Sequence, residues 1–577
     1  MTVENNNNRL SGNSLSFFYL CLDYLKNHSL YAIISSFVIV LSYGFYATKY
    51  TFNLDQLVPE YYDGNVLISA GRWAAPLIHF FTNWMEFSPF WHTVLMMLLL
   101  WISGLCWIIL FKKASFNQIK DKALFVFWCL FPICPMITEQ LTYPILNIAL
   151  AYVLTPIAIW LLYPIFFEKN LKIINLLIAA LFMLVSIDMY ESFAPVFLTG
   201  FCAVLILQYV FSAKPADKPF VSLVSVLLKV AFFLAGVIIL DFLISKIICF
   251  ISTGSFEFWY KNNSLPKWFT YGGLLDSVVW MLRSVLSHYF IAGAGNFSVL
   301  FFDVMLLAAI TMSILFSIKK KSLMPILLFA GLCISTVSLC LIEGFAPSYR
   351  TEQALPVFVA FIFMLLFEYA LNRKIIACFL SIITVILVLN ESQIINNYAV
   401  RNYEIFEYGY SRLREIGNAL EYYNTSEKPV AFINNANARV YPKTLYTPSE
   451  STNPLYTAFR DASCKFWDTV LPEKYFTDMD SITWSYAEIK IADANSLIQS
   501  EKSKTIIYYP LLTSLDFNQY YIADGYKALK RMGYDIIPCS QDEYEEANNH
   551  LIPEDNTIKF NITETDTMII VQLMSIN

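Results

Sequence analysis

Repeated apolar stretches in the first 391 residues constrain the fold more than any other feature of this sequence. Most are about 18–22 residues long, and a helix of that length crosses a hydrocarbon layer about 30 Å thick. The hydrocarbon layer holds no water to satisfy loose backbone amides and carbonyls, so each crossing segment must be a helix. The sequence therefore predicts a polytopic α-helical membrane protein.

We expect about eleven transmembrane helices, because eleven segments have the required length and apolarity. They lie at residues 30–47, 90–111, 123–138, 144–166, 173–189, 193–211, 221–244, 297–317, 323–342, 354–371 and 375–390. The segment from Met1 to Gly12 is polar and rich in asparagine, with no cleavable signal pattern. We therefore expect the first span to be an uncleaved anchor.

Basic residues predict the orientation of these helices. With the N-terminus in the cytoplasm, fourteen lysines and arginines fall in short cytoplasmic segments and six fall in the opposite loops. An excess of basic residues marks the cytoplasmic side of a membrane. We expect a protein of the bacterial inner membrane. An odd number of spans then places its C-terminal domain on the periplasmic side.

Residues 392–577 change character and predict a small soluble α/β domain. They carry 16 basic and 25 acidic residues, and an acidic domain repels nucleic-acid phosphates. Apolar spacing predicts helices at Arg401 to Tyr423 and at Tyr526 to Met532, the second ended by Gly533. The predicted strands are Val430 to Ile433, Thr505 to Tyr509, Asp535 to Ile537, Thr557 to Phe560 and Met568 to Leu573.

The eleven cysteines give no metal signature, since no CxxC motif or Cys/His cluster occurs. Nine of them precede residue 392, mostly inside predicted spans, where cysteine acts as a small apolar residue. Cys464 and Cys539 lie in the soluble domain. If that domain is periplasmic, a disulfide between them is an open possibility.

The loop after the first predicted span carries the strongest candidates for chemistry. It contains Asp55 and Asp63, followed by the tripeptide Gly71-Arg72-Trp73. The stretch from Val66 to Phe81 is amphipathic and suits the membrane surface. Each residue taken alone also suits an ordinary solvated loop, but the tripeptide places a fixed charge beside an aromatic ring at interface depth.

Further candidates lie at the outer ends of other predicted spans. They are Arg350, Glu139, Tyr190 and Glu191, with Asp188 as a weaker one. Charge at membrane depth is costly and often functional, although near an interface simple solvation explains it equally well. Four charges within or near spans, Lys229, Asp241, Asp303 and Glu368, follow no repeated pattern and favour a structural interpretation.

The order of these motifs resembles a known family. A first span is followed by an acidic loop, then by Gly71-Arg72-Trp73, an outer turn with Glu139, and the turn Tyr190-Glu191. This order is similar to that of the GtrII-type glucosyltransferases, of the GT-C class of polytopic glycosyltransferases. The resemblance covers about residues 30–391. The family's paired aspartates are replaced here by Asp55 and Asp63, which leaves open which one is catalytic.

The resemblance implies transfer of a hexose, expected to be glucose, from a polyprenyl-phosphate donor to a lipid-linked O-antigen or lipopolysaccharide glycan. A carboxylate takes the proton of the acceptor hydroxyl, with Asp55 the first choice and Asp63 the second. Arg72, with Arg350 as the second cation, would bind the phosphate, because guanidinium binds phosphate with two parallel donors. Glu139, Tyr190 and Glu191 would support the site.

The same resemblance implies partners and leaves a cofactor open. A donor-synthesising glucosyltransferase and a donor flippase would act upstream. Two aspartates can work with or without a divalent metal, Mg²⁺ or Mn²⁺. We expect residues 392–577 to recognise the acceptor glycan.

Two other classes of function remain open at this stage. An O-antigen polymerase or a lipid-linked glycan flippase is one, although polymerases generally lack so large a soluble domain and a flippase should carry cations along its spans. A membrane transporter is the other, although transporters often show related halves and this chain shows none.

Overall fold

The structure is a computed structural model of the full chain. It describes residues 14–49, 68, 71–82, 89–139, 145–168, 170–212, 219–258, 278, 300–343, 352–434, 529, 532–537, 539–550, 552–553 and 560–573. The chain divides into two compact units; among the described residues, the first ends at Asn397 and the second begins at Tyr398.

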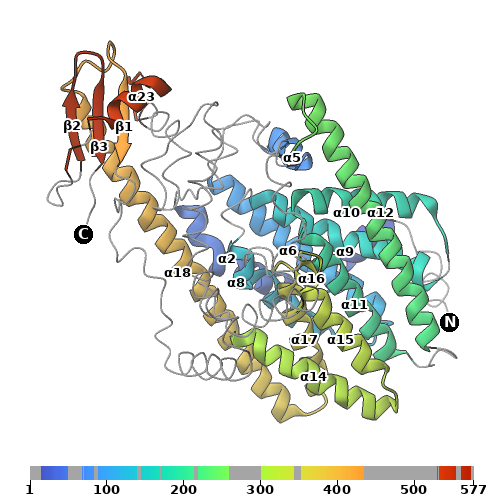
Figure 1. The fold of residues 1–577 in the computed structure, drawn as a ribbon. Helices are drawn as coiled ribbons and strands as arrows, with labels where there is room; N and C mark the ends of the chain where they lie inside the picture. Colours follow the sequence, from blue (N-terminus) through green and yellow to red (C-terminus); the bar gives the residue numbers. More distant parts are fainter. Residues whose placement is uncertain are drawn as a thin grey trace. The chain divides into compact units, whose positions relative to one another are not determined.

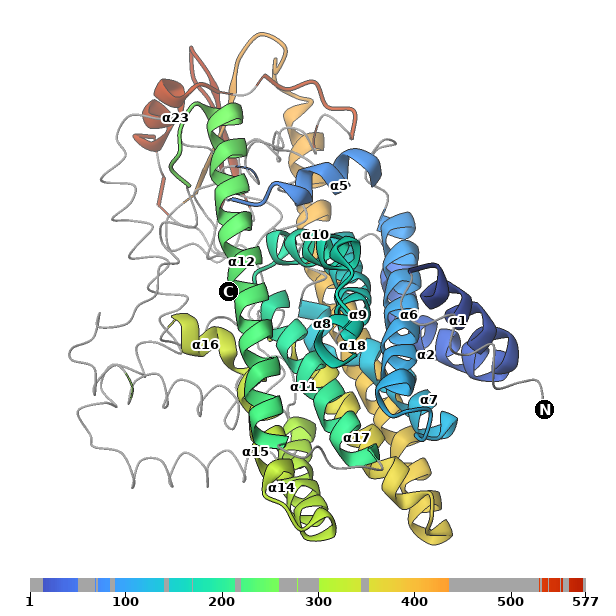
Figure 2. The same ribbon diagram turned by 90° about the vertical axis from the view of Figure 1, so that its right-hand side faces the viewer.

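The first unit is a bundle of apolar helices (Figures 1 and 2). Its helices, in chain order, are α1 (Ser14–Asn27), α2 (Ser29–Thr48), α5 (Ala74–Thr82), α6 (Pro89–Ala114), α7 (Asp121–Leu130), the 3₁₀ turn η1 (Phe131–Ile133), α8 (Pro135–Glu139), α9 (Ile145–Phe167), α10 (Ile173–Met189), α11 (Phe193–Phe211), α12 (Pro219–Thr253), α14 (Leu300–Lys320), α15 (Met324–Thr336), α16 (Ser338–Glu343), α17 (Leu355–Ala370) and α18 (Lys374–Leu420). The last helix continues past Asn397 into the second unit.

Six of the described helices are long and apolar enough to cross a membrane, so the chain is a polytopic helical membrane protein. They lie at Ser29–Thr48, Phe90–Ala114, Leu146–Phe167, Phe193–Phe211, Leu223–Thr253 and Lys374–Asn397. Shorter apolar helices occupy Ile173–Met189, Met324–Thr336 and Leu355–Ala370. The expected number of eleven crossings stays a prediction.

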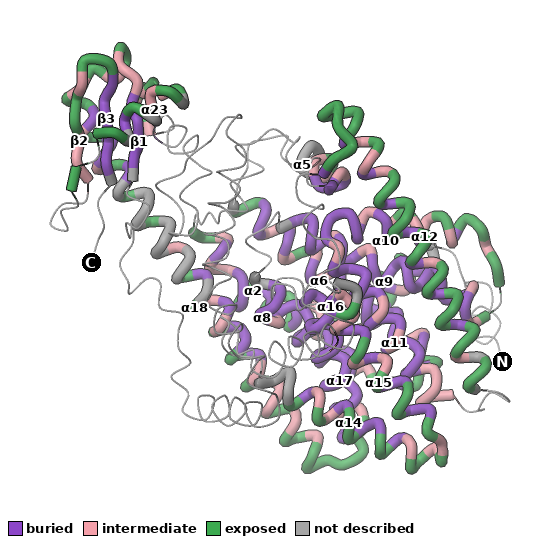
Figure 3. The backbone as a smooth tube through the Cα atoms, viewed as in Figure 1, coloured by how far each residue is buried: buried purple, intermediate pink, exposed green. Residues whose placement is uncertain are grey.

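Burial separates a core of helices from a periphery (Figure 3). The apolar stretch of α9 is 83% buried and packs against α6, α10 and α11, whereas those of α12 and α18 are 22% and 17% buried. Large aromatic side chains such as Trp107, Trp128 and Tyr152 are completely buried in this core. The peripheral helices α2, α12 and α18 expose rows of isoleucine, leucine and phenylalanine, which is the surface that a lipid environment requires.

Two predicted spans are interrupted rather than continuous. The predicted span 123–138 breaks into α7, η1 and α8, because Pro132 and Pro135 lack the amide that a continuous helix needs. The predicted span 323–342 breaks at Val337. There the Ser335 and Thr336 hydroxyls bind the carbonyls of Leu332 and Cys333 at 2.7 Å, which competes with helix bonding.

The remaining predicted spans coincide with single helices. The predicted bounds 173–189 and 193–211 are those of α10 and α11. The predictions for 221–244 and 375–390 were too short, since α12 and α18 continue well beyond them. The amphipathic stretch predicted at 66–81 is interrupted by a turn at Gly71, and α5 begins only at Ala74.

Hydrogen bonds tie the helix ends of the first unit into two polar layers. In the first layer, called here the basic end, the Gln118 amide donates to the Phe211 carbonyl and the Lys320 amine donates to the Ser212 carbonyl. The Lys113 amine lies 3.5 Å from the Glu168 carboxylate in the same layer. The second layer contains the end of α10 and the start of α5. Because α10 and α11 each run from one layer to the other, the layers lie at opposite ends of the bundle.

The second unit contains a three-stranded sheet in the order β1-β3-β2. Strand β1 (Val430–Asn434) runs parallel to β3 (Ile569–Leu573), and β2 (Phe560–Glu564) runs antiparallel to β3. Helix α23 (Gln541–Asn548) begins with a capping box formed by Ser540 and Glu543. Its Ala547 packs against the sheet in a small apolar core.

The sequence predictions for the second unit have mixed outcomes. Strands β1 and β3 lie where predicted, and β2 begins at Phe560, where the fourth predicted strand was expected to end. The predicted strand Asp535 to Ile537 is wrong, because these residues form no regular element. Among the described residues, one backbone bond joins the segment to β1, from the Val430 amide to the Ile537 carbonyl at 2.9 Å. Most of the helix predicted at Tyr526 to Met532, the strand Thr505 to Tyr509, and Cys464 lie outside the described residues.

The predicted helix Arg401 to Tyr423 is confirmed as part of α18, with Leu413, Ile416 and Leu420 buried. Gly533 has a φ of 97°, and the Tyr534 amide after it donates to the Leu529 carbonyl at 3.0 Å. That bond across a left-handed glycine is typical of a helix end.

We predict that Gly200→Ala lowers the thermal stability of the protein. A Cβ at Gly200 would overlap the Trp107 ring, and overpacking of this kind costs about 1–3 kcal/mol. Gly236→Ala on α12 is the matched control, because nothing lies within 4 Å of a Cβ there. Both variants would be heated in detergent and scored for the monodisperse fraction. Equal stability of the two would contradict the packing argument.

Candidate functional site

The Gly71-Arg72-Trp73 tripeptide forms a tight turn immediately before α5. Gly71 has a φ of 83°, a left-handed conformation that glycine adopts without strain, and its amide donates to the Ile68 carbonyl at 2.9 Å. The Ser245 hydroxyl of α12 donates to the Gly71 carbonyl at 3.2 Å. The turn is therefore held to a residue 174 positions further along the chain.

Asp188 at the end of α10 holds the other side of the turn. Its side chain is 1% exposed, and its two oxygens accept hydrogen bonds from the Trp73 amide at 3.1 Å and the Ala74 amide at 2.5 Å. The first amides of a helix have no partner within the helix, and a carboxylate is the strongest acceptor for them. Asp188 therefore caps α5 from another helix and fixes where α5 begins.

Arg72 points from this turn toward the end of α10. Its guanidinium lies 3.6 Å from the Glu191 carboxylate and 5.4 Å from the centre of the Tyr190 ring. Arg72 is 8% exposed, whereas the Glu191 side chain is 39% exposed. A guanidinium over an aromatic ring and beside a carboxylate keeps one orientation, which is what binding a phosphate through two parallel donors requires.

A second acid lies near this turn on α12. Asp241 is one helical turn before Ser245, on the same face of the helix, and is 4% exposed. The sequence analysis favoured a structural role for Asp241 because no pattern linked it to other charges. The fold shows that Asp241 lies one turn from Ser245, which binds the Gly71 carbonyl. The sequence alone did not link Asp241 to Gly71.

Three of the seven predicted site residues come together in the described part of the chain. Arg72, Tyr190 and Glu191 meet at one end of the bundle. Glu139 ends α8, and its side chain lies outside the described residues. Asp55, Asp63 and Arg350 also lie outside them, so their roles stay predictions. Within the described residues, no three His, Cys, Asp or Glu side chains could together hold a metal ion.

Asp188 is the residue that the sequence analysis undervalued. Its signal was present, since an aspartate ends an apolar helix two residues before the Tyr190-Glu191 pair. Nothing in the sequence, however, joins Asp188 to Trp73 and Ala74, which are more than 100 residues away along the chain. The end of α10 positions Arg72 in two ways. Asp188 fixes the turn that contains Arg72, and Tyr190 and Glu191 contact its side chain.

Comparison with known protein families gives a match over most of the bundle. The family described as Glucosyl transferase GtrII matches residues 44–367, which is more than half of the chain. The chain belongs to the GtrII glucosyltransferase family. The resemblance inferred from the order of motifs is thereby confirmed, and the protein is a membrane-embedded glycosyltransferase. A comparison with curated proteins gave no match.

The GtrII match covers the predicted site residues and stops before the described part of the second unit. All seven predicted site residues, as well as Asp188 and Asp241, lie within residues 44–367. The sheet of the second unit lies outside the match. The turn before α5 therefore lies inside the family-matched region of this GtrII protein, and the sheet lies outside it.

We predict that Asp188→Asn destabilises the protein, because it removes a buried charged acceptor from two helix amides. Hydrogen bonds to a charged group contribute about 1.5–3 kcal/mol. Asp23→Asn on α1 is the matched control, since the Asp23 side chain is exposed. The readout is the melting temperature of both variants in the same detergent. A melting temperature for Asp188→Asn as high as that of Asp23→Asn would show that the cap is dispensable.

Proposed function

We propose that this GtrII-family protein transfers a hexose, expected to be glucose, from a polyprenyl-phosphate donor to a lipid-linked O-antigen or lipopolysaccharide glycan. The reaction takes place at the periplasmic face of the inner membrane, where the turn before α5 lies in the proposed orientation. The upstream partners are an enzyme that makes the lipid-linked donor and a flippase that delivers it. The proposal includes the GT-C class for the bundle.

The observation that carries this proposal is the fixed position of Arg72 within the family-matched region. Asp188 and Ser245 hold the backbone on either side of Arg72, and Glu191 and Tyr190 hold its side chain. A cation that keeps one position does not have to reorganise when charge develops near it, so it stabilises that charge strongly. The lipid phosphate that leaves in this reaction is such a charge.

The transfer breaks one bond and forms one. The bond from the anomeric carbon to the phosphate oxygen breaks, and its electron pair leaves with the polyprenyl phosphate. The acceptor hydroxyl oxygen bonds to the anomeric carbon and gives its proton to a carboxylate, assigned to Asp55 first and Asp63 second. The anomeric centre gains oxocarbenium character on the way, which nearby negative charge stabilises.

In this scheme Arg72 binds the phosphate of the leaving group. Its guanidinium offers parallel donors to the phosphate and stays protonated at any relevant pH. Glu191 holds the guanidinium before the donor arrives, and its partly exposed carboxylate can yield that place to the phosphate. Arg350, the second predicted cation, is assigned to the same phosphate.

The test is transfer by the purified protein, reconstituted in lipid, with radiolabelled polyprenyl-phosphate glucose and the lipid-linked glycan. We expect wild type to release polyprenyl phosphate and to label the glycan. Arg72→Ala should lower the rate by about 10²-fold or more, as removal of one stabilising donor does. One of Asp55→Asn and Asp63→Asn should lower it by about 10²–10⁴-fold, which identifies the base.

Arg373→Ala is the matched control for Arg72→Ala, because Arg373 follows α17 at the basic end of the bundle. Each variant needs a melting temperature beside its rate, so that loss of the Arg72–Glu191 contact is distinguished from loss of fold. If wild type changes glycan chain length instead of adding a side-branch hexose, the polymerase alternative is correct. If Arg72→Ala keeps the wild-type rate, the phosphate assignment is wrong.

We also propose that the second unit recognises the acceptor glycan. A chain that ends after Asn397 keeps the hydrogen bonds Ser42–Ser392 and Asn396–Leu41, which hold α18 to α2. We expect this truncation to bind the polyprenyl-phosphate donor like wild type and to lose transfer to the native glycan. Donor binding would be measured by titration and transfer by radiolabel. Full transfer by the truncated chain would contradict the assignment.

A further inference from the structure

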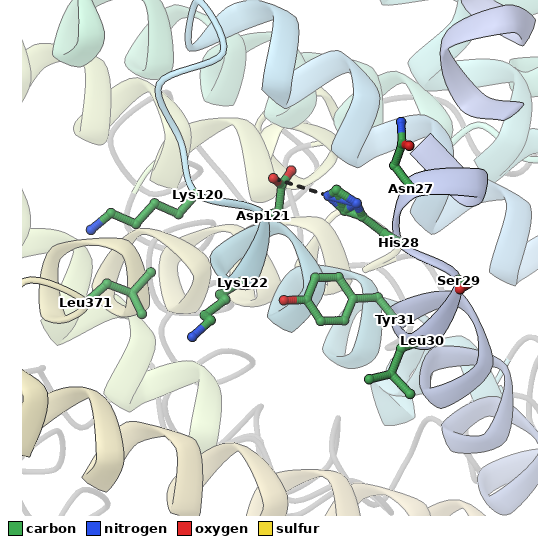
Figure 4. Close-up of a pocket in the computed structure, with 9 residues that line it drawn as sticks. All are labelled: Asn27, His28, Ser29, Leu30, Tyr31, Lys120, Asp121, Lys122 and Leu371. Carbon is green, nitrogen blue, oxygen red and sulfur yellow. Dashed lines mark ion pairs between the residues drawn. The ribbon is translucent and has the colours of Figure 1, made fainter. Parts of the chain in front are cut away.

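A pocket at the basic end of the bundle plays no part in the proposed transfer. It has a volume of about 590 Å³ and lies between the start of α2, the start of α7 and the turn after α17 (Figure 4). Its lining is Asn27, His28, Ser29, Leu30, Tyr31, Lys120, Asp121, Lys122 and Leu371. In Figure 4 the residues that open α2 stand on one side of the pocket, and Lys120, Lys122 and Leu371 stand on the other.

Three of the polar lining residues are held in place by neighbours. His28 Nε2 lies 3.2 Å from the Asp121 carboxylate, the Tyr31 ring stacks on Phe125 at 4.5 Å, and the Lys120 amine donates to Asn372 at 2.8 Å. The pocket is therefore built before any ligand arrives, and its donors do not have to be ordered on binding.

The charges around the pocket leave it positive. Its one carboxylate, Asp121, already accepts a bond from the Lys112 amine at 2.7 Å. Glu368 is the other acid nearby, and it accepts the Lys120 backbone amide at 2.9 Å. The Lys120 amine donates to the Asn372 side chain at 2.8 Å and also interacts electrostatically with Glu368. Lys122 is exposed and makes no ion pair with any described residue. Lys112, Lys120 and Lys122 thus outnumber the two carboxylates, Asp121 and Glu368, by one positive charge.

Apolar surface continues from the pocket along α2, and α18, which begins three residues after Leu371, also exposes apolar side chains. From the start of α2, Leu30, Ile33 and Phe37 are each more than 60% exposed and share one face of the helix. From the start of α18, Ile375, Phe379 and Ile382 are more than 50% exposed on one face. A ligand that fills the pocket with an anionic group can lay apolar chains along these two faces.

We propose that this pocket binds the phosphate headgroup of an anionic membrane phospholipid. The two lysines supply the charge, and the Tyr31 and Ser29 hydroxyls and the Asn27 amide supply further donors to phosphate oxygens. The lipid chains cover the exposed faces of α2 and α18. A soluble phosphate has the same headgroup chemistry but gains nothing from these apolar faces, so the lipid is the ligand that the whole surface matches.

The test measures lipid binding to the purified full-length protein by native mass spectrometry. Phosphatidylglycerol, phosphatidylcholine and inorganic phosphate are the three probes. We expect saturable binding of phosphatidylglycerol and about 30-fold weaker binding by the double variant Lys120→Gln with Lys122→Gln, because each basic residue near an anionic lipid surface contributes about a fivefold factor. Lys122→Gln alone should weaken binding about fivefold.

Lys319→Gln is the matched control, because Lys319 is an exposed lysine at the end of α14 that does not line the pocket. Wild-type affinity for phosphatidylglycerol in this variant supports a specific pocket. The proposal is overturned if Lys319→Gln weakens binding as much as Lys122→Gln does, or if phosphatidylcholine binds as tightly as phosphatidylglycerol. It is also overturned if inorganic phosphate binds alone and displaces the lipid, since the ligand is then a soluble anion.

Discussion

The position of Arg72 at the end of the bundle opposite the basic end depends on one buried carboxylate. Asp188, at the end of α10, accepts the first amides of α5 and so decides where the chain turns before that helix. Two residues later, Tyr190 and Glu191 receive the Arg72 side chain from the same turn. A loop attached only at its ends would let Arg72 move among many rotamers. Fixed through α10 and α12, the guanidinium is held where a phosphate can meet it.

Across the bundle, apolar side chains pack the middle of the helices, and polar contacts fix their ends. Helices α6, α9, α10 and α11 pack through aromatic and aliphatic side chains, with glycines such as Gly200 making room for tryptophan. The hydrogen bonds and ion pairs that fix helix ends gather in two layers. One layer holds the proposed transfer site. The other holds the positive pocket, which we propose binds a lipid headgroup.

Most helices of the bundle were predictable, because a segment that crosses hydrocarbon must be apolar over a helix of sufficient length. The bounds of α10 and α11, the long apolar α9 and the helix that enters the second unit follow from apolar length and spacing. The interruptions at Pro132 and Val337 were not foreseen, since apolarity continues through both. No strand forms at Asp535 to Ile537, where the described residues show one backbone bond to β1 rather than a ladder.

The sequence by itself determined the membrane class, the family through the order of its short motifs, and the candidate residues Arg72, Tyr190 and Glu191. Those properties depend on local composition and on position along the chain. Only the tertiary structure decided that Asp188 caps α5, that Ser245 holds Gly71, and that His28, Tyr31 and Lys122 line one pocket. These contacts join residues from distant parts of the chain, and their geometry depends on how the helices pack rather than on any local pattern.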